Sequence, residues 1–204
     1  MPKAVDEDKR RHEFFTASWD IIATEGLSAA TMRRVSSGAG CTTGALTHYF
    51  PDRASLLIET LRAAHFATAA RMRDAASVAD TPLGRLRSVL LEALPLDTER
   101  MREWKVWLAF WAAAIGNPVL IDENAKRYAE WRAVIEILVA PLLSQKRDAL
   151  VQANLVVALV DGIALHAVLS DMGEARLDQI ATDCTEQLDK YLGAVFPSVT
   201  NNKE

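Results

Sequence analysis

Two short stretches, each long enough for one short helix and separated by a glycine, constrain this chain more than any other feature. Thr31 and Thr42 each stand directly before an apolar-spaced run, where a threonine oxygen can accept a hydrogen bond from a free amide at a helix start. The sequence therefore predicts helices over 32–39 and 43–49. Gly40 lies between them, where a tight turn favours a positive φ. This pattern is typical of a helix-turn-helix, whose second helix enters the DNA major groove.

The residues around these helices follow an ordered pattern from Phe14 to Leu57. The pattern begins with Gly26, which ends a helix, and Thr31 five residues later, and continues with a turn over Ala39 to Thr42. A second glycine, Gly44, and the aromatic pair Tyr49-Phe50 follow, and Arg53 precedes the leucines Leu56-Leu57. In this pattern the chain resembles the DNA-binding domain of the TetR family of transcriptional repressors. Three residues depart from the usual valine, serine and aromatic: Cys41, Thr42 and Thr47.

The resemblance implies an all-α fold with a three-helix helix-turn-helix head over 1–55 and a helical ligand-binding and dimerisation domain over 56–204. It implies a regulator, in the first instance a repressor, that binds a palindromic double-stranded operator as a homodimer and is released by a small organic ligand. The C-terminal two-thirds resemble the choline-responsive, BetI-like branch more loosely. The signs are Glu103-Trp104, the run Trp107 to Trp111, Asn117-Pro118, Tyr128 with Trp131-Arg132, and Val160 to Gly162.

The outer faces of the two short helices and the residues beside them supply the predicted DNA contacts. Hydroxyl groups and arginines can donate to phosphates, whereas Leu46 and Phe50 are expected to point inward. His48 and Tyr49 are included because the matching family residues reach phosphates. The candidates are Thr31, Arg33, Thr42, Thr43, Ala45, Thr47, His48, Tyr49 and Arg53. The alternative is a solvated polar surface that binds nothing.

Charge and composition agree with a cytoplasmic helical protein. The formal net charge of −4 is unusual for a DNA binder, but acidic and basic residues balance over the first 65 residues. Half of the residues are apolar, with only 9 glycines and 7 prolines, which favours helices around a sizeable core. The two cysteines have no metal-ligand or disulfide spacing. No leader is expected, and charge-free runs such as 149–160 fall short of the roughly 18 to 20 apolar residues that span a bilayer.

Helix start and stop signals predict seven further helices and no strands. Gly26 ends the first helix, Pro82 opens one, Gly116 to Pro118 separates two, Pro141 bends or stops another, and Gly173 precedes the last. The expected helices cover 9–25, 53–76, 82–95, 97–115, 119–143, 147–172 and 174–195. Residues 1–8 are expected to be frayed.

Aromatic residues at helical spacing give the candidate ligand site. A cage of rings would hold an organic cation through cation–π attraction, with Asp122, Glu123 or Asp161 as countercharge. The candidates are Trp104, Trp107, Phe110, Trp111, Tyr128 and Trp131. The alternative is that these rings fill the core between helices, which is the more common role of an aromatic stripe at helical spacing.

The last two helices carry apolar faces too wide for one partner. Small residues within them, Gly162, Ala164 and Ala167, allow close helix approach. We therefore expect a homodimer formed by a four-helix bundle, although both faces could instead be covered within one chain.

An enzyme is the main rival class. The four histidines are scattered, and no catalytic, metal-binding or cofactor motif accompanies them, so no catalysis, metal or cofactor is expected. A third possibility is a dimeric ligand-binding helical protein without DNA-binding function.

Overall fold

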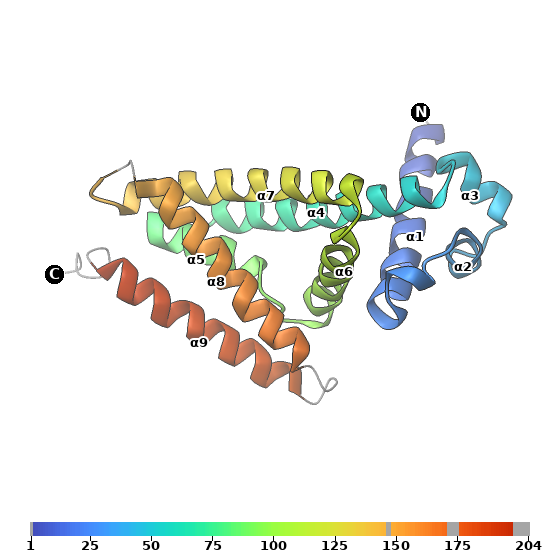
Figure 1. The fold of residues 1–204 in the computed structure, drawn as a ribbon. Coiled ribbons are helices and arrows are strands. Elements are labelled where there is room, and N and C mark those ends of the chain that lie inside the picture. The colour runs from blue at the N-terminus through green and yellow to red at the C-terminus, as the bar shows by residue number, and fades with distance from the viewer. Residues whose placement is uncertain (1, 146–147, 171–175, 198–204) are drawn as a thin grey trace. The chain divides into compact units, whose positions relative to one another are not determined.

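The computed structural model describes residues 2–145, 148–170 and 176–197, and the regular secondary structure of these residues is helical throughout (Figure 1). This confirms the all-α prediction. The α-helices are α1 (Pro2–Glu25), α2 (Met32–Gly38), α3 (Thr43–Tyr49), α4 (Arg53–Ser77), α5 (Pro82–Glu92), α6 (Thr98–Ala114), α7 (Pro118–Val139), α8 (Ala149–Leu169) and α9 (Leu177–Val195). The 3-10 turn η1 (Leu27–Ala29) lies between α1 and α2, and η2 (Ala140–Leu142) follows α7.

Most helix boundaries lie within a few residues of the predicted ones, and the clearest difference is at the start. Helix α1 begins at Pro2, so the expectation of frayed residues before Lys9 was wrong. Proline suits the first helical position, and no helix breaker follows it before Gly26. The predicted stop at Pro141 is confirmed, because α7 gives way to η2 there. Gly173 and the predicted start of the last helix lie outside the described residues.

The chain forms two compact units. The first unit comprises residues up to Phe66 together with Lys105–Glu123, and the second comprises Ala67–Trp104 and the residues from Asn124 onward. The helix-turn-helix therefore lies wholly in the first unit.

The core of the first unit holds α3 against α1. Phe14, Leu46 and Phe50 are almost completely buried, and the ring of Phe14 meets that of Phe50 edge-on with centroids 6.0 Å apart. Trp19 Nε1 donates a hydrogen bond of 3.3 Å to the carbonyl of Thr60, which ties α1 to α4. Buried aromatic area of this kind dominates the packing energy of a small core.

A buried carboxylate also joins two helices of the first unit. Glu123 on α7 is 4% exposed, and its two carboxylate oxygens accept hydrogen bonds of 3.0 Å from Nε and Nη2 of Arg62 on α4. Arg62 Nη1 also donates to Glu59 at 2.8 Å. A two-pronged bond of this kind fixes direction as well as distance.

Apolar faces and two arginine–carboxylate pairs organise the second unit. The buried faces of α8 and α9 include Val160 and Leu188. Arg87 on α5 donates to Asp189 on α9 at 2.6 and 2.9 Å. Arg71 on α4 donates to the buried Glu103 on α6 at 2.8 and 2.7 Å.

Helix α8 has the length and apolar composition of a membrane-spanning segment: 21 residues, Ala149–Leu169. The sequence estimate counted charge-free runs only and therefore ended at Val160, whereas the apolar helix continues past the single charge of Asp161. Composition alone does not separate such a helix from the core helix of a globular protein. The packing of α8 does bear on the choice, because one face of it is buried inside the second unit, with Val156 and Ala164 among the buried residues.

Candidate functional site

The two predicted helix caps are present and position the helix-turn-helix. The side-chain oxygen of Thr31 accepts a hydrogen bond of 3.2 Å from the amide of Arg34, and that of Thr42 accepts one of 3.2 Å from the amide of Ala45. Gly40 has a φ of 64°, the left-handed value that the turn requires. Local chemistry therefore fixes where α2 ends and α3 begins.

Helix α3 is anchored on one side and exposed on the other. Leu46 is buried at its centre. The hydroxyl of Thr47 donates to the carbonyl of Thr43 at 2.8 Å, and the hydroxyl of Thr43 lies 3.2 Å from that of Ser36. These bonds set the directions of both hydroxyl groups. The predicted contacts that α3 exposes are Thr43, Ala45, Thr47 and His48.

Tyr49 stands at the end of α3 among aromatic rings and an arginine. Its ring packs edge-on against Phe14 with centroids 5.2 Å apart, and the His48 ring lies 5.7 Å away. The guanidinium of Arg11 on α1 lies 5.8 Å from the Tyr49 ring and 5.4 Å from that of Phe50, within cation–π range. Tyr49 is therefore partly a packing residue, and α1 brings a positive charge beside it.

Arg53 has an internal role that the sequence did not predict. Its Nε donates to the carbonyl of Ala30 at 2.8 Å and its Nη2 to that of Leu27 at 2.6 Å. These bonds hold the start of α4 against η1. Two of its donors are thus engaged, and the phosphate contact expected of Arg53 stays a prediction.

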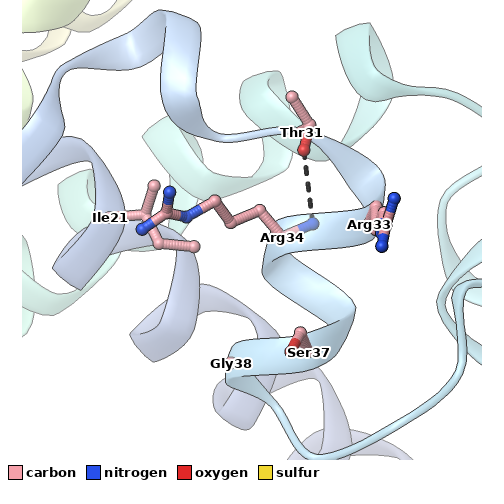
Figure 2. Close-up of a pocket in the computed structure, with 6 residues that line it drawn as sticks. All are labelled: Ile21, Thr31, Arg33, Arg34, Ser37 and Gly38. Carbon is pink, nitrogen blue, oxygen red and sulfur yellow. Dashed lines mark hydrogen bonds between the residues drawn. The ribbon is translucent and has the colours of Figure 1, made fainter.

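A depression of about 570 Å³ lies beside α2 in the first unit (Figure 2). Its lining consists of Ile21, Thr31, Arg33, Arg34, Ser37 and Gly38. Arg34 extends toward Ile21 and Arg33 points away on the other side of the helix. Arg34 also forms an ion pair with Glu25. With Arg34 paired to Glu25, Arg33 and the hydroxyl groups of Thr31 and Ser37 are the lining residues that suit an anion such as a phosphate.

Two polar residues of this depression, Arg34 and Ser37, were not among the predicted contacts. Helical spacing could have found them, since Arg34 follows Thr31 by three positions and Ser37 follows Arg33 by four. Packing explains the glycine at position 38, because a Cβ there would lie 3.3 Å from that of Ala17 on α1.

The six aromatic candidates divide between the two units and differ in burial. In the first unit, Phe110 is completely buried, whereas Trp107 and Trp111 are half-buried. In the second unit, Trp104 is buried and its Nε1 donates to the carbonyl of Ala93 at 2.8 Å, while Trp131 and Tyr128 are half-buried. Phe110 and Trp104 therefore behave as core residues, and a ligand contact by any of the six stays a prediction.

Tyr128 contacts one of the three proposed countercharges. Its hydroxyl donates to Oδ2 of Asp161 on α8 at 2.8 Å. Burial raises the pKa of Asp161 to about 6, and the hydrogen bond from Tyr128 opposes that rise. Burial and the neighbouring carboxylate also raise the pKa of Tyr128. Of the other two candidates, Glu123 is engaged by Arg62 and Asp122 is exposed.

Comparison with known proteins agrees with the family resemblance of both the N-terminal and the C-terminal part of the chain. Residues 15–60 match the family model described as bacterial regulatory proteins, tetR family, and residues 82–193 match that of the BetI-type transcriptional repressor, C-terminal. The chain is 34% identical over 171 residues to the HTH-type transcriptional regulator PksA of Bacillus subtilis, covering 83% of each protein.

Solved structures show the same fold. A transcriptional regulator from Rhodococcus sp. Rha1 matches with a TM-score of 0.79 and 27% identity, over 92% of this chain and 96% of that one. A putative transcriptional regulator from Saccharomonospora viridis in complex with choline matches with a TM-score of 0.75 and 21% identity, over 89% and 96%. With a capped helix-turn-helix in its first unit and a BetI-type region after it, this chain belongs to the TetR family of DNA-binding transcriptional regulators.

Proposed function

We propose that the protein represses transcription by binding a palindromic operator as a homodimer, and that a small organic effector releases it. The observation that carries the proposal is the surface of α3. It is exposed and polar on one side, and buried Leu46 and the cap at Thr42 hold it in place on the other. A helix fixed in this way can enter a major groove without rearrangement of the head.

The contacts divide by chemistry. Thr43, Ala45 and Thr47 on α3 would face base edges, where hydroxyl and methyl groups discriminate weakly between bases. Thr31 and Arg33 at α2, with Thr42, His48 and Tyr49 at the ends of α3, would contact phosphates. The depression at α2 supports this division, since Arg33 and Thr31 both line it.

The dimer would form through the exposed faces of α8 and α9. Large apolar side chains on α8 are about half exposed or more: Leu150, Val151, Leu155 and Leu169. Gly162 on α8 and Gly193 on α9 lie within helices, and a Cβ added to either would contact nothing. Glycine inside a helix destabilises it by roughly 1 kcal/mol relative to alanine. Close approach of another helix would explain why both positions hold glycine despite this cost.

Leu155→Glu should convert the dimer to a monomer without unfolding it. Leu155 is 55% exposed in the single chain, so the charge would be tolerated by the monomer and buried only in the dimer. Sedimentation at micromolar concentration measures the change. Ile137→Glu on α7 is the matched control, because Ile137 is 73% exposed and lies on neither dimer helix. A Leu155→Glu protein that stays dimeric contradicts the proposed interface.

The effector would be held by aromatic rings of the C-terminal region, and half-buried Tyr128 and Trp131 are the candidate contacts within the second unit. We further infer that the protein is not an enzyme and acts in the cytoplasm, in keeping with the relatives, which are named as transcriptional regulators. A ligand binder without DNA function is the alternative, and the exposed α3 with its cap at Thr42 argues against it.

In vitro selection tests the operator proposal. The purified protein is incubated with sheared genomic DNA, and the retained fragments are sequenced. A dimer with two recognition helices should enrich a palindrome whose half-sites lie about one helical turn apart. Enrichment of single, unpaired half-sites would contradict the dimeric mode, and no enrichment would contradict operator binding.

A further inference from the structure

Helix α3 lacks the side chains that form the strongest hydrogen bonds to bases. Its sequence, Thr43 to Tyr49, contains no arginine, lysine, asparagine, glutamine or carboxylate. Those side chains form two-pronged bonds to guanine or adenine, or accept a hydrogen bond from cytosine. The side chains that α3 exposes at its start and middle are Thr43, Ala45 and Thr47. Base recognition by this helix therefore depends on two hydroxyl groups and three methyl groups.

The hydroxyl of Thr47 is occupied within its own helix. It donates its proton to the carbonyl of Thr43 at 2.8 Å, four residues earlier. A hydroxyl carries one proton, so Thr47 has no donor left for the acceptor atoms of guanine, adenine or thymine. The bond also draws the oxygen toward the backbone of the preceding turn. The γ-methyl is then the outer group of this exposed side chain.

The hydroxyl of Thr43 is occupied by a residue of α2. It lies 3.2 Å from the hydroxyl of Ser36, which itself donates to the carbonyl of Arg33 at 2.9 Å. Because the proton of Ser36 is used in that bond, Thr43 is the donor of the threonine–serine pair. Ser36 is 2% exposed, so the bond turns the oxygen of Thr43 toward the core. This arrangement leaves the γ-methyl of Thr43 on the exposed side.

The same surface contains a third methyl group and a position without a side chain. Ala45 is exposed and contributes its β-methyl, while its amide donates to the Thr42 cap. Gly44, between Thr43 and Ala45, is exposed as well, and a Cβ there would make an ordinary contact of 3.9 Å with Thr42 Oγ1. The packing of the described residues therefore does not require glycine, whereas its small size allows bases to approach the backbone closely.

We propose that α3 recognises its operator through the C5-methyl groups of thymine, which the methyl groups of Thr43, Ala45 and Thr47 contact in the major groove. Among the four bases of DNA, thymine presents a methyl group in that groove, and apolar side-chain atoms recognise it by contact. This inference rests on the proposed operator binding and names the base feature that α3 recognises. The operator half-sites should contain thymines at the positions that α3 covers.

Exchange of thymine for deoxyuridine tests the proposal, because it removes the C5-methyl group and keeps the base pair. The probe is the palindrome enriched from genomic DNA, synthesised with thymine or with deoxyuridine in its half-sites, and anisotropy measures the affinity. Each contacted methyl group should contribute about fourfold to the affinity, as expected for the burial of one such group. A duplex with deoxyuridine only outside the half-sites is the control and should bind as the thymine duplex does.

Two variants of Thr47 separate its methyl group from its hydroxyl. Thr47→Ser removes the methyl and keeps the hydroxyl, whereas Thr47→Val keeps a methyl and removes the hydroxyl. Both are changes at an exposed position. Thr47→Ser should bind the thymine duplex about fourfold more weakly for each half-site, and deoxyuridine should no longer weaken binding at one position of each half-site. Thr47→Val should match the wild-type protein in both respects.

Three results would overturn the proposal. The first is a deoxyuridine effect that Thr47→Ser leaves unchanged at every position, because the effect would then come from the shape of the DNA. The second is a Thr47→Val protein that loses as much affinity as Thr47→Ser, because the hydroxyl would then be the recognising group. The third is equally tight, specific binding to thymine and deoxyuridine half-sites, which would leave the proposed operator binding intact. Absence of any specific operator would overturn both proposals together.

Discussion

Ala45→Glu should abolish specific operator binding, with an expected loss of at least about 100-fold, while leaving the head as stable as before or more so. Ala45 is exposed on α3, so a glutamate there meets no core residue. In the complex it would bring a negative charge and extra bulk against the DNA. Anisotropy with a labelled operator measures the affinity, and thermal unfolding measures the stability.

The opposite signs of these two effects make the variant informative. Glutamate at position 45 stands three residues after the Thr42 cap and completes a Thr-x-x-Glu capping box, which stabilises a helix start. Ala112→Glu, an exposed site on α6 in the same compact unit, makes the same charge change and should alter affinity less than about threefold. If Ala45→Glu binds the operator as well as Ala112→Glu does, α3 is not the recognition helix.

Arg71→Met should lower the free energy of unfolding by about 3 to 5 kcal/mol. Arg71 is the two-pronged partner of Glu103, whose side chain is 5% exposed. Among the described residues, its removal leaves that buried carboxylate with the Thr68 hydroxyl at 3.3 Å as its hydrogen-bond partner. Denaturation by urea measures the loss. Adding Glu103→Gln should restore part of the stability, because the unpaired charge is then gone.

The exposed pair in the same unit supplies the control. Arg87 and Asp189 have the same two-pronged geometry, but both side chains are more than 40% exposed. Surface pairs contribute roughly 0 to 1 kcal/mol, so Arg87→Met should cost less than about 1 kcal/mol. Equal losses for Arg71→Met and Arg87→Met would show that burial does not set the contribution of these pairs.

Local chemistry made the head predictable from sequence. The caps at Thr31 and Thr42, the turn at Gly40 and the helical spacing of Leu46 and Phe50 each involve residues no more than four positions apart. Such signals can be read from one chain without knowledge of its tertiary packing.

Contacts distant in sequence were the ones that could not be predicted. The two carbonyls that engage Arg53 lie 23 and 26 residues before it, and the carbonyl that engages Trp104 lies 11 residues before it. Similarly, the sequence offered three carboxylates as countercharges. Only the fold shows that Glu123 is engaged by Arg62, 61 residues away, while Asp161 faces a tyrosine.

The most direct test of the central claim is fluorescence anisotropy of the purified protein on duplexes from the DNA flanking its own gene, with a scrambled duplex as control, at physiological salt. The account predicts tight binding to one palindrome, at least about 1,000-fold above the scrambled duplex. Equal, weak binding to both duplexes that disappears as salt rises would be the sequence-independent phosphate interaction alone. That result would contradict a specific operator at this locus.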